Sequence, residues 1–354
     1  MSLVIAAGGT GGHVFPALAV AEAWRQRWPD KPIFWIGREG GREEEWIQKA
    51  GIPFYGMPAA GWQPRAFWRN LSLLYRLPKA FWAVEKLMRQ LKPKGVFSTG
   101  GYPGFMPSLW AGLHSRPLFL LELNRYPGRT IRWLSRFAFR VFGAFPETIG
   151  LKAEWIGVPV RFSSADRVRY TPSEAKRSWG IPEDRSLILV LGGSQGSTSL
   201  NQAVFESLRA WIEAGAFILW QVGRQIPQNL PSEVLTVPFI EDMVRAYIAA
   251  DIVVSRAGGS TLGELAWWGK AAVLVPSPHV AEDHQRKNAA FWEERGAALV
   301  VEEENVPALR EAVLYLLRKP EKRIEIARAA QALSRPEAAN QLAEYLHTVL
   351  YGIS

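Results

Sequence analysis

The chain has 354 residues, of which 48% are hydrophobic and 21% charged, the composition of a soluble globular protein long enough for two domains. It contains no cysteine, which excludes disulfides, thiolate zinc sites and a cysteine nucleophile. No apolar run approaches the ~18 residues of a membrane-spanning helix. The first residues also lack the basic and then apolar pattern of a secretory signal, so we expect a protein that is not secreted.

The net charge of +9 is concentrated in one part of the sequence. Residues 62 to 140 contain 14 lysines and arginines but only two acidic residues, whereas the remainder is slightly acidic. This uneven charge predicts a polyanion or an anionic membrane surface as a partner.

The first half alternates short apolar runs with longer amphipathic stretches. Its predicted strands are 3–7, 32–36, 95–98, 118–121 and 140–144. Strands alternating with helices over this length predict a parallel sheet covered by helices.

The second half repeats this alternation. Its predicted strands are 187–191, 217–222, 235–238, 252–255, 271–275 and 298–301. Prolines, serines and charges without periodicity mark residues 157–174 as the boundary between the halves. We therefore predict two Rossmann-like domains, at 1–158 and 164–335, followed by an amphipathic helix near the end of the chain.

Both halves open with a strand, a glycine turn and a helix. Such a turn places unpaired N–H groups at the start of a helix, where phosphate binds, and glycine lets a phosphate approach the backbone. The glycines concerned are Gly8, Gly9, Gly11, Gly12, Gly192, Gly193 and Gly196. The alternative is a tight turn that binds nothing. A third glycine cluster lies at 98–107, so one domain could hold two phosphate groups.

Known phosphate-binding motifs restrict the class of ligand that these loops could bind. The P-loop pattern is absent, and the dinucleotide pattern lacks its third glycine because His13 or Val14 stands there. No D-x-D carboxylate pair is present, and the remaining histidines form no metal-ligand pattern. A metal-free nucleotide-sugar site without any other cofactor is the prediction that remains.

Seven motifs in order resemble the MurG-type glycosyltransferases, which transfer N-acetylglucosamine from UDP to a lipid-linked muramyl-peptide. The motifs are GGTGGHVFPALAVA at 8–21, TGGYPGFMP at 99–107, GVPVR at 157–161, LGGSQGSTSLN at 191–201, PFIEDM at 238–243, ADIVVSRAGGSTLGELA at 250–266 and EDHQRKNA at 282–289. The resemblance implies the two-Rossmann GT-B architecture. It also implies that the final helix, at 337–354, packs back on the first domain.

The resemblance implies roles for individual residues. It places the uracil at the Ile240 backbone, the ribose at Glu264 and the sugar at Gln285. The remaining UDP-sugar contacts would come from Thr10, Gly11, Gly12, Asn124, Arg161, Gly193, Ser194 and Gln195. The acceptor diphosphate would lie at Gly9, Gly100, Gly101 and Tyr102. His13 would be the catalytic base, because a histidine with its pKa near neutrality can accept the proton of a hydroxyl.

Several of these residues have structural alternatives. His13 could form a local cap bond at a helix start, and Thr261 with Glu264 matches a capping box. Ser194 and Gln195 could cap a helix, and Gln285 could be ordinary surface polarity. The chain also departs from the family, which commonly reads H-E-Q-N where residues 121–124 read LELN and commonly has asparagine in place of Val158.

Residues 61–82 interleave aromatic and basic side chains without an acid, which is typical of a membrane interface. The predicted membrane-facing residues are Trp62, Arg65, Phe67, Trp68, Arg69, Leu73, Leu74, Arg76, Lys79, Phe81 and Trp82. The predicted extension of this basic face comprises Arg125, Arg129, Arg132, Arg136 and Arg140, with Trp133. The alternatives are an ordinary helix with a solvated basic side and an RNA surface, but no RNA-binding motif accompanies the segment.

The sequence therefore predicts an inverting, metal-independent N-acetylglucosaminyltransferase. The resemblance implies UDP-N-acetylglucosamine as donor, a polyprenyl-diphosphate muramyl-peptide as acceptor, and a peripheral location at the cytoplasmic face of the inner membrane. Three alternatives stay open. They are a related enzyme that glycosylates diacylglycerol, a dinucleotide-dependent oxidoreductase, and a non-catalytic module that binds RNA or membranes.

Overall fold

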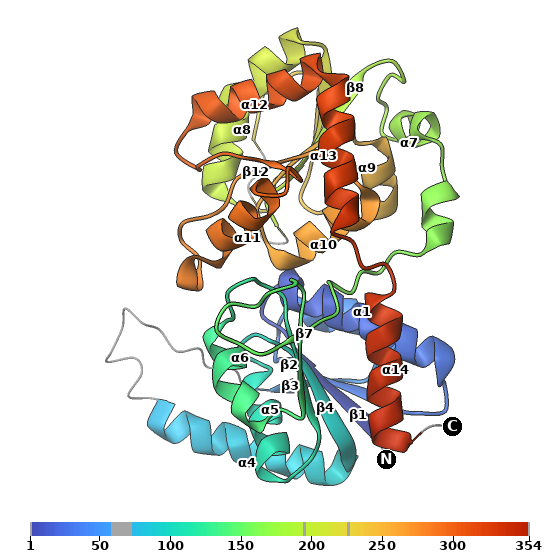
Figure 1. The fold of residues 1–354 in the computed structure, drawn as a ribbon, viewed down its shortest axis with the longest axis vertical. Helices are drawn as coiled ribbons and strands as arrows, with labels where there is room; N and C mark the ends of the chain where they lie inside the picture. The colour runs from blue at the N-terminus through green and yellow to red at the C-terminus, as the bar shows by residue number, and fades with distance from the viewer. Residues whose placement is uncertain (1, 58–72, 194–195, 225–226, 353–354) are drawn as a thin grey trace. The chain divides into compact units, whose positions relative to one another are not determined.

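The computed structural model describes residues 2–57, 73–193, 196–224 and 227–352. Within these residues the chain divides into two compact units (Figure 1). Unit 1 comprises Met1–Arg161 together with Pro336–Ser354, and unit 2 comprises Phe162–Arg335. Each unit is a parallel sheet covered by helices, which confirms the predicted α/β class.

The described part of unit 1 contains a seven-stranded parallel sheet in the order β3-β2-β1-β4-β5-β6-β7. Its strands are β1 Ser2–Ala7, β2 Ile33–Arg38, β3 Phe54–Met57, β4 Pro93–Gly100, β5 Leu118–Glu122, β6 Arg140–Gly143 and β7 Glu154–Trp155. The central strand β1 pairs with β2 on one side and β4 on the other. The strand order reverses there, so the carboxyl ends of β1 and β4 flank the position where open α/β sheets bind ligands.

Helices cover both faces of this sheet. They are α1 Gly11–Arg27, α2 Glu43–Lys49, α4 Leu73–Leu91, α5 Phe105–Leu113, α6 Arg129–Leu134, the 3-10 turn η1 Ser135–Phe137 and α14 Ala338–Tyr351. Helix α14, from the end of the chain, lies beside α1 (Figure 1). The His347 ring stacks on Trp28 at 4.0 Å, and Lys94 donates to the Leu350 carbonyl.

The described part of unit 2 contains a six-stranded parallel sheet in the order β10-β9-β8-β11-β12-β13. Its strands are β8 Ser186–Leu191, β9 Ala216–Gln221, β10 Val234–Val237, β11 Ile252–Ser255, β12 Ala272–Leu274 and β13 Leu299–Val300. The order reverses between β8 and β11, as it does between β1 and β4 in unit 1. The equivalent ligand position therefore lies at the carboxyl ends of β8 and β11.

The helices of unit 2 follow the same alternation. They are η2 Ser164–Val168, α7 Pro172–Ser178, α8 Thr198–Glu213, α9 Met243–Ala249, α10 Gly259–Trp268, η3 Ala281–Asp283, α11 His284–Glu293, α12 Val306–Arg318 and α13 Pro320–Ala332. Helix α7 begins at a capping box in which Thr171 and Glu174 exchange hydrogen bonds. No helix in the described residues is long and apolar enough to span a membrane.

Most of the strands that were predicted from the sequence are buried in the two cores. Every residue of β1 is buried, as its continuous apolar sequence predicts for a central parallel strand. Trp24 and Trp35 are completely buried in the same core, which they stabilise by removing large apolar surfaces from water. The edge strand β3 and the two-residue β7 were not predicted, because β3 is only partly buried and β7 is too short to show a pattern.

Candidate active site

The first glycine loop connects β1 to α1. Thr10 occupies the N-cap of α1 in an extended conformation and forms no side-chain cap. Gly9 has a φ of +93°, which a residue with a side chain rarely adopts. A Cβ on Gly8 would lie 2.5 Å from a carboxylate oxygen of Glu43, so the glycine there is required by space. The N-terminus of α1, beginning at Gly11 and Gly12, follows directly.

The buried carboxylate of Glu43 supports this loop through a hydrogen bond. Glu43, the first residue of α2, accepts hydrogen bonds from the backbone N–H groups of Gly9 at 3.2 Å and Arg38 at 3.0 Å. Its side chain is buried, and Gly41 also has no room for a Cβ beside it. This residue was not predicted from the sequence, since the run Glu43–Glu44–Glu45 shows no sign of which member is buried.

His13 lies in the first turn of α1 and is tied to β4. Its Nδ1 lies 2.9 Å from the Thr99 carbonyl oxygen, while the Thr99 hydroxyl donates to the His13 carbonyl. A carbonyl only accepts, so Nδ1 carries the proton and the lone pair of the neutral ring is on Nε2. This ring contact is to Thr99, 86 residues away, and not the local cap bond considered as the alternative.

The second glycine loop of unit 1 lies against the first. Gly100 and Gly101 both have positive φ, and a Cβ on Gly101 would lie 2.6 Å from the Gly8 carbonyl and 3.4 Å from the His13 ring. The N–H of Gly100 donates to the Ser98 hydroxyl. Burial raises the pKa of the neighbouring Tyr102 phenol. The two loops and the His13 ring thus form one cluster in unit 1.

Glu122 ends β5 and binds the segment that follows it. Its buried carboxylate accepts from the Asn124 N–H at 2.9 Å, the Asn124 side-chain amide at 3.0 Å and the Gly128 N–H at 2.9 Å. Burial raises the pKa of Glu122 to about 7, although these hydrogen bonds oppose the shift. Leu121 and Leu123, which depart from the family pattern, are buried in the core of unit 1.

Arg161 is also engaged within unit 1. Its guanidinium makes a bidentate pair with Glu22 of α1, with N–O distances of 2.7 and 2.9 Å. Val158, the other departure from the family pattern, packs partly buried against the core of unit 1. The donor contacts assigned to Asn124 and Arg161 stay predictions, and both side chains already have carboxylate partners.

The glycine loop of unit 2 connects β8 to α8. Gly193 and Gly196 have positive φ, and Ser197 caps α8 by accepting from the Leu200 N–H. The neutral side chain of Gln221 supports the loop, donating to the Gly193 carbonyl at 2.9 Å and accepting from the Ile240 N–H at 2.9 Å. Two further predicted site residues, Ser194 and Gln195, lie outside the described residues.

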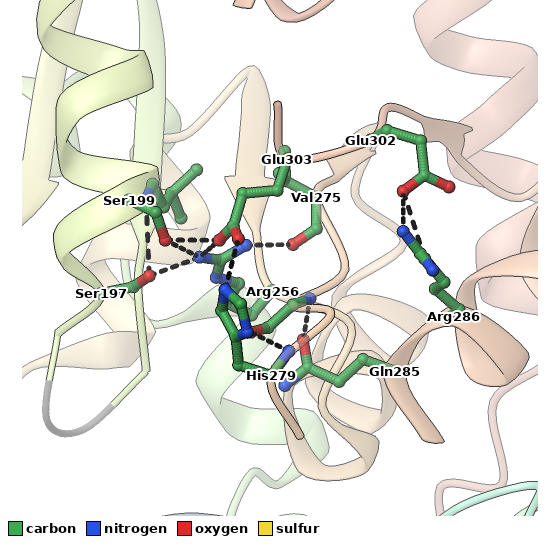
Figure 2. Close-up of polar contacts among 11 residues, drawn as sticks. Ser197, Ser199, Arg256, Val275, His279, Gln285, Arg286, Glu302 and Glu303 are labelled. Carbon is green, nitrogen blue, oxygen red and sulfur yellow. Dashed lines mark hydrogen bonds and ion pairs between the residues drawn. The ribbon is translucent and has the colours of Figure 1, made fainter. Parts of the chain in front are cut away.

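A buried arginine lies beside the start of α8 (Figure 2). Arg256, which follows β11, donates to the hydroxyls of Ser197 and Ser199, to the Val275 carbonyl and to the carboxylate of Glu303. Burial opposes ionisation of Glu303, but the bonds from Ser199 and Arg256 hold its pKa below the ordinary value. Neither residue was predicted as a site residue, because Arg256 stands inside a longer motif and Glu303 lies in none.

Two more residues predicted to contact the UDP-sugar lie on helices of unit 2. Glu264 in α10 accepts the Tyr247 hydroxyl at 2.8 Å. The capping-box alternative for Thr261 and Glu264 is wrong, because α10 begins two residues before Thr261 with Gly258 at its N-cap. Gln285 is the second residue of α11, and its side-chain oxygen accepts from the Ser277 N–H at 2.9 Å (Figure 2).

Few of the predicted membrane residues can be placed. Trp62, Arg65, Phe67, Trp68 and Arg69 lie outside the described residues, and only the backbone of Leu73, Leu74 and Arg76 is described, in α4. Farther along α4, Lys79 is exposed, Phe81 is half-buried and Trp82 is 68% exposed. More exposed apolar and basic side chains follow on neighbouring elements of unit 1, namely Leu113, Arg129, Arg132, Trp133, Arg136, Phe137, Phe139 and Arg140.

Comparison with known proteins identifies the chain. The models of the N-terminal and C-terminal domains of glycosyltransferase family 28 match residues 3–143 and 187–342. Proteins from Salinibacter ruber and Cupriavidus necator, both called UDP-N-acetylglucosamine–N-acetylmuramyl-(pentapeptide) pyrophosphoryl-undecaprenol N-acetylglucosamine transferase, are 36% and 37% identical to it. Those alignments cover 96% and 97% of this chain and 95% and 96% of the relatives.

Solved structures agree with the sequence comparison. The crystal structure of Acinetobacter baumannii MurG matches with a TM-score of 0.75 and 28% identity over 98% of this chain and 99% of that one. The calicheamicin glycosyltransferase CalG4 shares the fold, with a TM-score of 0.68 at 16% identity over 100% of this chain and 99% of that one. Two parallel α/β units and these neighbours define a glycosyltransferase of GT-B architecture, as predicted. The chain belongs to glycosyltransferase family 28 and, within it, to the MurG-type N-acetylglucosaminyltransferases.

Proposed function

We propose that this protein transfers N-acetylglucosamine from UDP-N-acetylglucosamine to the C4 hydroxyl of lipid-linked N-acetylmuramyl-pentapeptide, the step from lipid I to lipid II in peptidoglycan synthesis. The near full-length relationship to transferases of this name supports the reaction. The observation that carries the chemistry is the His13 ring, whose hydrogen bond to Thr99 leaves the lone pair on Nε2 beside two glycine loops.

The reaction is a displacement at the anomeric carbon. The acceptor hydroxyl loses its proton to Nε2 of His13 while its oxygen bonds to that carbon from the face opposite the diphosphate. The bond between the carbon and the phosphate oxygen breaks, UDP leaves, and the configuration inverts. Donor contacts in unit 1 would come from Thr10, Gly11 and Gly12, with Asn124 and Arg161.

Unit 2 would bind the rest of the donor. The diphosphate would lie at Gly193, Ser194 and Gln195, where the start of α8 favours negative charge. Arg256, itself paired with Glu303, holds the serines that open this helix. Ile240 would present its backbone to the uracil, Glu264 would accept from the ribose hydroxyls, and Gln285 would contact the sugar. Among the described residues, no cluster of acidic or histidine side chains suitable for a metal is present.

The acceptor would bind on unit 1. Its diphosphate would lie at the loops containing Gly9, Gly100, Gly101 and Tyr102. Since the N–H groups of Gly9 and Gly100 already donate to Glu43 and Ser98, we expect the stronger contacts at Gly101 and Tyr102.

The exposed aromatic and basic side chains of α4 to β6 would hold the protein on an anionic membrane. Each basic side chain near such a surface adds about 1 kcal/mol. A lipid-linked acceptor supports a peripheral location at a membrane, which we propose is the cytoplasmic face of the inner membrane.

The test is transfer of labelled N-acetylglucosamine from UDP to lipid-linked muramyl-pentapeptide, with and without a chelator. Diacylglycerol and acceptor-free reactions are the controls. Label in the muramyl lipid despite the chelator is the expected result. Label only in the diacylglycerol reaction would support the proposed donor but refute the proposed acceptor. Absence of transfer in all reactions would refute the proposed function.

A further inference from the structure

We propose that Tyr247 is a positioning residue that holds the Glu264 carboxylate for the ribose hydroxyls of the nucleotide donor. The inference rests on the proposed function, in which Glu264 meets the ribose. It adds the residue that determines how this carboxylate is presented, and thus part of the preference for a ribonucleotide over a deoxyribonucleotide.

The contact is a single directed hydrogen bond between two helices that flank β11. The Tyr247 hydroxyl, on α9, donates to Oε2 of Glu264, on α10, at 2.8 Å. Tyr247 is completely buried, whereas Glu264 is only partly buried. A charged acceptor makes this bond stronger than one between neutral groups. The bond therefore fixes one carboxylate oxygen from the buried side.

The phenol ring cannot easily turn away from this position. Trp268 stacks on it with ring centroids 6.0 Å apart, and Phe162 meets it edge-on, also at 6.0 Å. Burial and the Glu264 charge raise the pKa of Tyr247 well above its ordinary value, so the phenol stays a donor throughout the pH range of an assay. A rigid donor of this kind restricts the rotamers of a flexible glutamate, which lowers the entropy lost when the ribose binds.

The Tyr247→Phe variant removes the hydroxyl and keeps the ring. We expect it to raise the KM for UDP-N-acetylglucosamine and the Ki of UDP about 5–30-fold, the effect of losing one hydrogen bond to a charged group. The Ki of 2′-deoxy-UDP should change little, because that ligand lacks one of the hydroxyls that the carboxylate accepts. The Ki of 2′-deoxy-UDP divided by the Ki of UDP therefore falls toward one, while kcat stays within about twofold of the wild-type value.

Tyr170→Phe is the matched control. The Tyr170 hydroxyl accepts from Arg245 at 3.0 Å in the same unit, so this variant also loses one tyrosine hydrogen bond. We expect it to keep the wild-type ratio of Ki values. Thermal midpoints of both variants report whether a loss of binding reflects a loss of folding.

The ratio of the two Ki values tests the positioning role of Tyr247 separately from the ribose assignment of Glu264. A Tyr247→Phe enzyme that folds and keeps the wild-type ratio would overturn the positioning role. Wild-type enzyme that transfers the sugar but shows no preference for UDP over 2′-deoxy-UDP would overturn both that role and the ribose assignment of Glu264. Glu264→Gln gives a second test independent of the folding of Tyr247→Phe, since a wild-type ratio in that variant would also overturn the inference.

Discussion

The first glycine loops of the two units occupy the same place in sheets of the same strand order, yet they are held by different chemistry. In unit 1 a buried carboxylate, Glu43, accepts the Gly9 N–H, and the His13 ring lies beside the loop. In unit 2 the neutral Gln221 supports the loop, and the buried Arg256 bonds to the serines that open α8. A shared backbone turn therefore does not determine the ligand. We propose that the loop of unit 1 serves proton transfer to His13 beside the acceptor diphosphate, and that the loop of unit 2 binds the diphosphate of the donor.

The largest effect is expected on kcat when the proposed base beside the loop of unit 1 is replaced. His13→Gln should lower kcat about 10²–10⁴-fold, because a positioned base contributes that much to the rate. Steady-state transfer to the lipid-linked acceptor measures it. His114→Gln, which changes a histidine on another helix of unit 1, should retain near-normal kcat. Comparable losses in the two variants would refute the assignment of the base.

The next effect concerns the stability of unit 2. Glu303→Gln removes the charge that balances the buried Arg256, and breaking such a pair costs about 3–5 kcal/mol. The adjacent Glu302→Gln is the matched control, since Glu302 pairs with Arg286 in a more exposed position, where ion pairs contribute about 0–1 kcal/mol (Figure 2). Urea unfolding measures both values. Equal losses would mean that the Arg256 pair adds no more than a surface pair.

A smaller effect is expected at the loop of unit 1. Glu43→Gln can keep one oxygen for the Gly9 and Arg38 N–H groups, which both donate to Oε1, but it turns two charge-assisted bonds into weaker neutral ones. This change should cost about 1–3 kcal/mol of stability. We expect kcat to fall while the Ki of UDP stays near the wild-type value. Glu45→Gln, an exposed neighbour paired with Lys49, is the control. A change in the Ki of UDP without a change in kcat would contradict the distinction between the loops.

The smallest effect is a pH dependence confined to unit 1. Burial lowers the pKa of His347 below its ordinary value, so the folded state favours the neutral ring, with Lys31, Asp30 and Lys94 as the nearby charges. The neutral His347 ring stabilises the folded protein at pH values above the pKa that this histidine has in the unfolded chain. This stabilisation is lost as the pH falls below that pKa. His347→Phe keeps a ring against Trp28, so its unfolding temperature should fall less than that of wild type between about pH 7.5 and about pH 5.5. Parallel curves would contradict this prediction.

The sequence predicted the sheets better than the side-chain contacts around them. Continuous apolar runs such as β1 and β8 identify central strands, because burial on both faces requires them. The capping box at Thr261 was wrong because Gly258 and Gly259 start the helix earlier, and glycine gives no distinct sign of a cap. Glu43, Arg256 and Glu303 were missed as a group of contacts, since their partners are distant in the chain and leave no spacing to detect.

The measurement that tests the central claim most directly is calorimetric titration of UDP into the wild-type, His13→Gln and Glu43→Gln proteins, beside their kcat for transfer. Both variants should bind UDP within about twofold of wild type while kcat falls, most of all for His13→Gln. UDP binding that weakens in proportion to kcat in both variants would contradict the proposal that the loop of unit 1 serves proton transfer and the loop of unit 2 binds the donor diphosphate.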